Sequence, residues 1–284
     1  MKNPLVSVIV PTRNSAGFLS ACLTSIKNQT YKNIEIVIVD NYSIDKTKII
    51  AKSLRHSGER RDSRIPIKFY SHGPERSAQR NFGAKKSRGK YIYFVDSDFL
   101  LDKNIIHQCV AKITEGYDAI VVHNTPDETV SWIAKIRKFE VDMYKYDLTH
   151  SAARFFKKSI YRKIKGYDER ITAGEDYDIQ NRLNRNGYKT GFIDAEAIHL
   201  GEPKSFWKHM LKYYKYGKDF ENYSKQNRKE TVQQLNFFRK VYFKNWKKFI
   251  KNPFLSTTFI IYLICKYVAG ATGFIKFRYE MKNN

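Results

Sequence analysis

The chain has 284 residues, 42% of them hydrophobic, which excludes wholesale disorder and allows one ordinary domain with a large core plus an appendage. Its formal net charge of +24 indicates an anionic partner. The three cysteines, Cys22, Cys109 and Cys265, are widely spaced and odd in number, which argues against a disulfide framework and favours a reducing compartment. Met1 to Pro4 lead directly into an apolar run, so we expect no signal peptide and a cytoplasmic main domain.

Three apolar runs in the first hundred residues have the composition of buried strands, at 6–10, 34–39 and 91–95. A helical pattern follows the first run, with apolar residues at i, i+3, i+4 and i+7 spacing from Leu19 to Ile26. Strands that alternate with helices predict a doubly wound, mostly parallel α/β sheet. Ligands bind at the carboxyl ends of such strands, so the polar residues that follow each run should share one crevice.

The third run stops at two carboxylates, Asp96 and Asp98, one residue apart. Such a pair suits Mg²⁺ or Mn²⁺ carrying a phosphate, because hard cations prefer oxygen ligands. Alone, two acids that close a strand are more often a solvated turn. The residues 55–64, between the second helix and a strand at 67–70, are predicted to form a charged surface loop.

Together, the motifs of the first 200 residues resemble those of the family-2 inverting glycosyltransferases of GT-A fold. The order and spacing are specific, although each motif alone is weak. The matching segments are 6–14, 36–43, 76–83 and 96–98, followed by 174–178, 182–183, 187 and 198–199.

The resemblance implies a nucleotide-diphosphate-sugar site. It assigns Asp96 to the nucleotide and Asp98 to the metal, with His199 as a further metal ligand, although a histidine behind an apolar residue is more often structural. Arg76 and Arg80 lie one helical turn apart, so either could reach the diphosphate; the alternative is a solvated basic face. By the same resemblance, the residues around the base and ribose are Pro11, Thr12, Arg13, Asn14, Asp40 and Ser43.

Glu175 and Asp176 open a predicted helix after a glycine. Acidic residues in the first turn of a helix also stabilise its amino terminus. The alternative is therefore that these two residues only stabilise the start of the helix. Direct displacement at an anomeric carbon requires a base near the acceptor hydroxyl. Asp176 is therefore the candidate catalytic base, and Glu175 is expected to position the acceptor or the metal-side network.

We expect a catalytic domain at 1–203 and a basic helical extension at 204–284, which has 18 Lys/Arg, 4 Asp/Glu and 20 aromatic residues. This composition could bind single-stranded nucleic acid or anionic lipid. An amphipathic helix predicted at about 235–251 and an apolar segment at about 254–275 favour lipid. The segment's only charge is Lys266, and it could span the bilayer or lie on its surface; packing against the catalytic domain is the other alternative.

The predicted function is a metal-dependent inverting hexosyltransferase that uses Mg²⁺ or Mn²⁺ and a GDP- or UDP-sugar, a mannosyl donor being one option. The expected acceptor is a lipid-linked saccharide, another glycan or polyprenyl phosphate. We expect the protein at the cell membrane, with its catalytic domain on the cytoplasmic side and no nucleic-acid partner. The alternatives are an inactive membrane scaffold, a basic nucleic-acid-binding protein, and a retaining or nucleotidyl-transfer enzyme of related fold.

Overall fold

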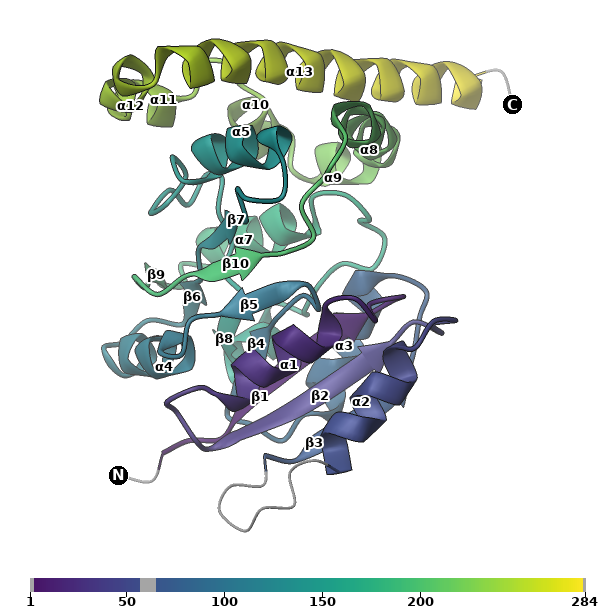
Figure 1. Ribbon diagram of the computed structural model, residues 1–284, viewed down its shortest axis with the longest axis vertical. Coiled ribbons are helices and arrows are strands. Elements are labelled where there is room, and N and C mark those ends of the chain that lie inside the picture. The colour runs from purple at the N-terminus through teal and green to yellow at the C-terminus, as the bar shows by residue number, and fades with distance from the viewer. Residues whose placement is uncertain (1–2, 57–64, 283–284) are drawn as a thin grey trace. The chain divides into compact units, whose positions relative to one another are not determined.

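The computed structural model describes residues 3–56 and 65–282 (Figure 1). Most of the predicted loop at 55–64 lies outside the described residues, and Arg55 and His56 end a helix. The chain forms two compact units. Unit 1 contains Met1–Asn124, Ala152–Glu169 and Ile179–Gly201, and unit 2 contains Thr125–Ser151, Arg170–Asp178 and Glu202–Asn284. The functional division at residue 203 stays a prediction.

Unit 1 is built on a seven-stranded sheet of order β3-β2-β1-β4-β8-β6-β9. The pairs β1–β2, β2–β3, β1–β4 and β6–β9 are parallel, whereas β8 runs antiparallel to both neighbours. The predicted α/β class with a mostly parallel sheet is therefore confirmed. The strands are β1 (Val6–Thr12), β2 (Ile34–Asp40), β3 (Ile67–Ser71), β4 (Tyr91–Phe94), β6 (Ala119–Val121), β8 (Phe155–Lys157) and β9 (Thr190–Phe192).

Side chains alternate between two apolar layers along the central strands, because successive residues of a strand point to opposite faces. In β1, Val8 and Val10 enter the cluster that contains the apolar residues of α1, whereas Ile9 enters the cluster that contains Ala84 of α3. Both faces of the sheet are thus buried, as a doubly wound fold requires. The helices concerned are α1 (Leu19–Lys27), α2 (Thr47–His56), α3 (Arg76–Lys86), α4 (Ile105–Thr114), α6 (Lys158–Lys163) and the later part of α7 (Glu175–Arg185).

Two short strands in unit 1 form an antiparallel pair outside the large sheet. They are β5 (Phe99–Leu101) and β10 (Ala197–His199), and their register places His199 opposite Phe99. This pairing brings the segment after the Asp96–Asp98 motif beside a strand about 100 residues later in the chain. The short strand β7 (Asn124–Pro126) follows at the first division between the units.

Unit 2 is mainly helical and has its own apolar cluster, formed by side chains of α5, α8, α11 and α13. The predicted amphipathic helix at 235–251 is instead two short helices that meet at Asn245, preceded by a non-helical turn from Leu235 to Arg239. The helices are α5 (Trp132–Val141), α8 (Phe206–Asp219), α9 (Glu221–Gln226), α10 (Arg228–Gln234), α11 (Lys240–Lys244), α12 (Trp246–Lys251) and α13 (Pro253–Lys282).

The helices α13 and α8 cross in close contact (Figure 1). Glycines permit the approach: a Cβ atom on Gly217 would overlap the carbonyl oxygen of Gly270, and one on Gly273 would overlap that of Tyr214. By length and composition, α13 is the one helix among residues 3–56 and 65–282 that could cross a membrane, over Pro253–Glu280. In unit 2, however, one side of this helix is packed against protein.

A buried carboxylate links the first strands of unit 1. Glu35 on β2 accepts hydrogen bonds from Ser7 Oγ at 2.7 Å and from the Arg88 backbone N–H, and it pairs with Lys68 at 3.0 Å. Burial alone would raise the pKa of Glu35, but these bonds outweigh it and lower the pKa to about 2.

We expect Glu35→Gln to lower the free energy of unfolding by about 1–3 kcal/mol at pH 7, because charge-assisted hydrogen bonds are lost. The folded-state pKa is depressed, so the stabilisation is complete above the unfolded value of about 4.3 and is lost as the pH falls towards 2. Urea unfolding across this range should show the two proteins converging at low pH. A difference in unfolding free energy between the two proteins that does not change with pH would contradict the role given to the ionised Glu35.

Candidate functional site

The ends of β1 and β2 form a polar cluster in unit 1. The register pairs Thr12 with Asp40, and Thr12 Oγ1 donates to Asp40 Oδ1 at 2.9 Å. Asp40 also accepts hydrogen bonds from the backbone N–H and hydroxyl of Ser43, at 2.9 and 2.5 Å. Asn14 joins the cluster through its backbone N–H, which donates to Ser43 Oγ at 2.7 Å. Four of the six residues predicted around the base and ribose are therefore linked directly.

The other two residues differ in exposure. Pro11 is buried in β1, whereas Arg13 is exposed immediately after the strand. The two loops at this edge contain Asn14 and Tyr42 with φ angles of 50° and 48°. Backbone held in this left-handed region is costly for residues other than glycine and is common at functional sites.

Asp96 follows β4 and lies between two arginines. Arg80 Nη2 donates to Asp96 Oδ1 at 2.9 Å, and Arg154 Nη1 donates to Oδ2 at 3.1 Å. Burial would raise the pKa of Asp96, but Arg154 and then Arg80 outweigh it and hold the pKa well below its usual range. Asp96 is thus a fixed, ionised carboxylate.

The two arginines predicted on one face of α3 differ in their surroundings. Arg80 is fully buried, is paired with Asp96, and lies 4.9 Å from the ring centroid of Tyr167. Arg76 is exposed in the first turn of the helix. The structure therefore makes Arg80 a partner of Asp96, and leaves Arg76 at the surface.

The sequence reasoning missed Arg154. It precedes β8, whose antiparallel pairing with β4 aligns Phe155 with Tyr93, so Arg154 is brought beside the end of β4. Its backbone carbonyl also accepts a hydrogen bond from the Phe94 N–H at 2.9 Å. A lone arginine in front of an aromatic strand was the available signal, but the pairing partner of that strand was not predictable from the pattern.

Asp98 and His199 are brought together by the pairing of β5 with β10. Asp98 Oδ2 and His199 Nε2 are 3.0 Å apart, and the backbone N–H of Leu200 donates to the Asp98 carbonyl at 2.8 Å. A Cβ atom on Gly201 would overlap Asp98 Oδ2, so a glycine at this position allows the Asp98 carboxylate to lie close against the backbone. Carboxylate oxygen suits Mg²⁺ or Mn²⁺, and a neutral imidazole can bind a transition metal such as Mn²⁺ beside it, so these two residues could supply ligands to a metal site. Among the described residues, no group of three or more metal-ligating side chains occurs.

Glu175 and Asp176 form the first turn of α7, in the part of that helix that belongs to unit 2. Glu175 is 7% exposed, whereas Asp176 is half-buried, so Asp176 is the more accessible carboxylate. Gly174 immediately precedes this turn. It has a φ of 92° and packs against the ring of Tyr223. Asn227 Nδ2 donates to Asp178 Oδ1 at 3.2 Å within the same unit.

The sequence profile of "Glycosyl transferase family 2" matches residues 7–169, more than half of the chain. The chain belongs to this family. It is a glycosyltransferase. A second profile, "Glycosyl transferase family group 2", matches residues 91–275.

Curated relatives agree with this membership. The chain is 28% identical to the uncharacterized glycosyltransferase MJ1057 of Methanocaldococcus jannaschii, over 93% of this chain and 88% of that protein. It is 26% identical to the GalNAc(5)-diNAcBac-PP-undecaprenol beta-1,3-glucosyltransferase of Campylobacter jejuni, over 77% of this chain and 75% of the relative. The chain spans less than two thirds of the length of several other curated glycosyltransferases that it matches.

Solved structures show the same fold. The mannosyltransferase PcManGT from Pyrobaculum calidifontis, in complex with GDP-Man and Mn²⁺, aligns with a TM-score of 0.71 and 13% sequence identity, over 97% of this chain and 88% of that protein. The likeness confirms the predicted GT-A fold. Likeness at this level of identity concerns the fold alone.

We expect Arg154→Ala to lower the free energy of unfolding by about 1.5–3 kcal/mol, because a charge-assisted hydrogen bond to the ionised Asp96 is lost. Arg154→Lys keeps the charge and should lose less. Arg162→Ala, on an exposed position of α6, is the matched control and should change little. Chemical unfolding of wild type and the three variants measures the differences in unfolding free energy. Equal stability of Arg154→Ala and wild type would contradict the role given to the hydrogen bond between Arg154 and Asp96.

Proposed function

We propose that the protein is a metal-dependent inverting glycosyltransferase that transfers a sugar from a GDP- or UDP-sugar to a lipid-linked saccharide, another glycan or polyprenyl phosphate. The observation that carries the proposal is the Asp98–His199 pair, 3.0 Å apart beside Gly201 and immediately after the Asp96 carboxylate. A nucleotide-diphosphate donor accounts for this combination of a hard-cation site and hydrogen-bonding strand ends.

In this proposal Asp98 and His199 hold Mg²⁺ or Mn²⁺. The cation would supply positive charge at the leaving diphosphate, an effect typically worth several kcal/mol of barrier. The mannosyltransferase PcManGT, which shares the fold, is described in complex with GDP-Man and Mn²⁺, and this supports the choice of cation and a guanine donor as one option.

The residues of the chain would bind and orient the donor. Asp40, with Thr12 and Ser43 already bound to it, offers a fixed acceptor for a base imino group or a ribose hydroxyl. Arg13 and Arg76 are exposed, and we propose that they contact phosphate oxygens of the donor. Arg80 is buried, so we propose that it acts on the donor through Asp96, by keeping that carboxylate ionised and in place.

We propose Asp176 as the general base that takes the proton of the acceptor hydroxyl. It is half-buried in the first turn of α7 and is more accessible than Glu175. Glu175, which is buried beside it, would position the acceptor or the surrounding network. Direct displacement by the activated hydroxyl inverts the anomeric centre; a retaining enzyme or a nucleotidyltransferase is the enzymatic alternative.

The acceptor and location follow from the extension and from one relative. The Campylobacter jejuni relative is named for an undecaprenol-linked substrate, and the extension of this chain is basic, aromatic and apolar. We therefore propose action at the cytoplasmic side of the cell membrane. A nucleic-acid-binding role would explain the charge but not the carboxylates at the strand ends, since acids oppose phosphate binding without a cation. An inactive scaffold would not require the fixed Asp96 or the Asp98–His199 pair.

Nucleoside diphosphate binding should require a divalent cation. We expect calorimetry with GDP or UDP to show a clear gain in affinity on adding Mn²⁺, and Asp98→Ala or His199→Ala to abolish that gain. Asp194→Ala, at an exposed carboxylate of unit 1, is the control and should keep it. Equal affinity with and without Mn²⁺ in the wild-type protein would remove the cation from the proposal.

Asp176→Asn should leave donor binding nearly unchanged and lower turnover by roughly 10²–10⁴-fold, the contribution typical of a general base, because asparagine keeps the shape and loses the basicity. Donor affinity by calorimetry and sugar transfer to an undecaprenol-linked acceptor would be measured on the same preparation. Near-normal transfer by this variant would mean that the base lies elsewhere, and Glu175→Gln would be tested next.

A further inference from the structure

The helix α13 has two different sides, both apolar. The side packed against α5 and α8 contains Ser256, Phe259, Tyr262, Leu263 and Gly273. A second stripe is exposed, and its members Ile261, Ile264 and Val268, at i, i+3 and i+7 spacing, are 55%, 49% and 59% exposed. The same stripe continues to Phe254 at one end and to Ile275 and Tyr279 at the other. Apolar residues that are exposed together along one side of a helix can mark an interaction site.

Polar contacts fix α13 to unit 2. Lys266, the only charged residue between 254 and 275, turns inward, and its Nζ lies 2.5 Å from Glu140 Oε1. Glu140 is buried and is also approached by Arg239 at 3.7 Å and by the Tyr144 hydroxyl at 2.6 Å. A helix that left unit 2 to cross a bilayer would separate this buried pair and place Lys266 in hydrocarbon. The glycine contacts with α8 would be lost as well.

Basic side chains flank the exposed stripe at both ends of α13. Lys247 and Lys251 are exposed in α12, just before α13 begins, and Lys276 and Arg278 are exposed near its end. Aromatic residues accompany them, since Trp246 is exposed in α12 and Phe254 contacts the ring of Trp132. This arrangement suits an anionic membrane surface. The apolar stripe could contact the acyl chains, while lysine, arginine and tryptophan at its borders could lie among the anionic headgroups.

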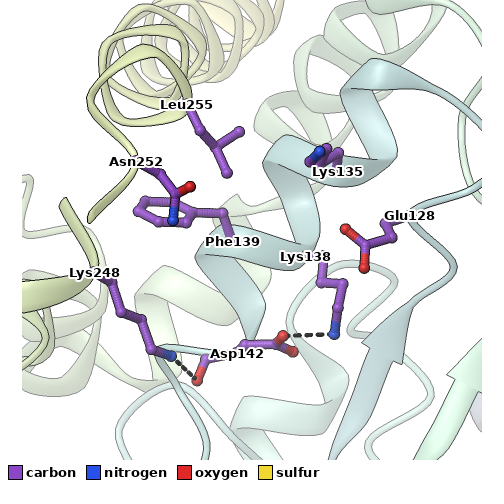
Figure 2. Close-up of a pocket in the computed structure, with 8 residues that line it drawn as sticks. All are labelled: Glu128, Lys135, Lys138, Phe139, Asp142, Lys248, Asn252 and Leu255. Atoms are coloured by element: carbon purple, nitrogen blue, oxygen red, sulfur yellow. Dashed lines mark hydrogen bonds and ion pairs between the residues drawn. The ribbon is translucent and has the colours of Figure 1, made fainter. Parts of the chain in front are cut away.

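A shallow pocket lies at the amino-terminal end of the same helix, between α5, α12 and α13 (Figure 2). Lys135, Lys138 and Lys248 line it, and Lys138 and Lys248 already bond to Asp142 at 2.6 and 3.3 Å. Phe139 and Leu255 form its apolar wall. The lining also contains the carboxylates of Glu128 and Asp142, so the pocket places three lysines and two acidic residues at the edge of the stripe.

We propose that the exposed stripe of α13 lies in the plane of a bilayer that contains anionic lipids, with the helix attached to unit 2 rather than inserted across the membrane. The proposal rests on the membrane location given above and adds its partner and its mode of attachment. It differs from the bilayer-spanning option left open by the sequence, and the difference follows from the Lys266–Glu140 pair.

The first test is binding of the full chain to vesicles. Ile261→Glu/Ile264→Glu should weaken binding to phosphatidylglycerol-containing vesicles by about tenfold or more, because two charges enter the apolar stripe. Wild type should bind pure phosphatidylcholine vesicles less well. Ile49→Glu, at a 67% exposed isoleucine of α2 in unit 1, is the matched control and should bind like wild type. The single variant Val268→Glu serves if the double variant unfolds.

Unchanged vesicle binding by these α13 variants would overturn the proposal. So would a wild-type chain that ignores anionic vesicles but forms a dimer that the variants dissociate, because a second copy would then cover the stripe. Metal-dependent nucleoside diphosphate binding, measured on the same variants in solution, should equal that of wild type. Loss of membrane binding with donor binding intact thus separates this proposal from the proposed function.

The second test distinguishes a helix in the plane from a helix that spans. Single cysteines at Lys251→Cys and Lys276→Cys, in a Cys265→Ala background where Cys22 and Cys109 are buried, would be exposed to an impermeant maleimide in sealed membrane vesicles. Labelling of both positions from the same side is expected. Labelling of one position from each side would show a spanning helix and contradict the proposal.

Discussion

The parallel pairing of β1 with both β2 and β4 is the constraint on which the candidate site depends. The register aligns Thr12 with Asp40 and Ile9 with Phe94, so the chain leaves all three strands at the same edge of the sheet. Two apolar layers lock this register, because a shift by one residue would turn every buried side chain to the opposite face. The core of the sheet therefore places the Asp40 cluster and the Asp96 carboxylate at one edge, and their own hydrogen bonds fix the side chains there.

The short β5–β10 pair adds the second element of the site. It places His199 beside Asp98, although 100 residues separate them in the chain, and Gly201 allows the Asp98 carboxylate to lie close against the backbone. The candidate base lies in the other unit, where Tyr223 and Asn227 of the extension contact the residues that lead into α7. The extension, for which we propose attachment to a membrane surface, thus also supports the turn that carries Glu175 and Asp176.

The local features of the fold could be predicted from the sequence, because alternating apolar runs and helical periodicity are properties of short segments. The apolar runs predicted directly that the strands end near Thr12, Asp40 and Asp96. Three features were not predictable because they depend on residues far apart in the chain. First, the pairing of β8 brings Arg154 to Asp96. Second, the Lys266–Glu140 pair fixes the orientation of α13. Third, Arg80 is buried against Asp96, although its spacing from Arg76 suggested a shared basic face. The break at Asn245 within the predicted helix of 235–251 was not predicted either.

The central claim is that a divalent cation binds between Asp98 and His199 and carries the donor diphosphate. Anomalous diffraction from crystals grown with Mn²⁺ and a nucleoside diphosphate would test it most directly. The account predicts a single strong manganese peak at metal–ligand distance, about 2.0–2.3 Å, from Asp98 and His199 and from a diphosphate oxygen. Nucleotide bound at the ends of β1 and β2 without manganese at this pair, or manganese bound at other carboxylates, would contradict it.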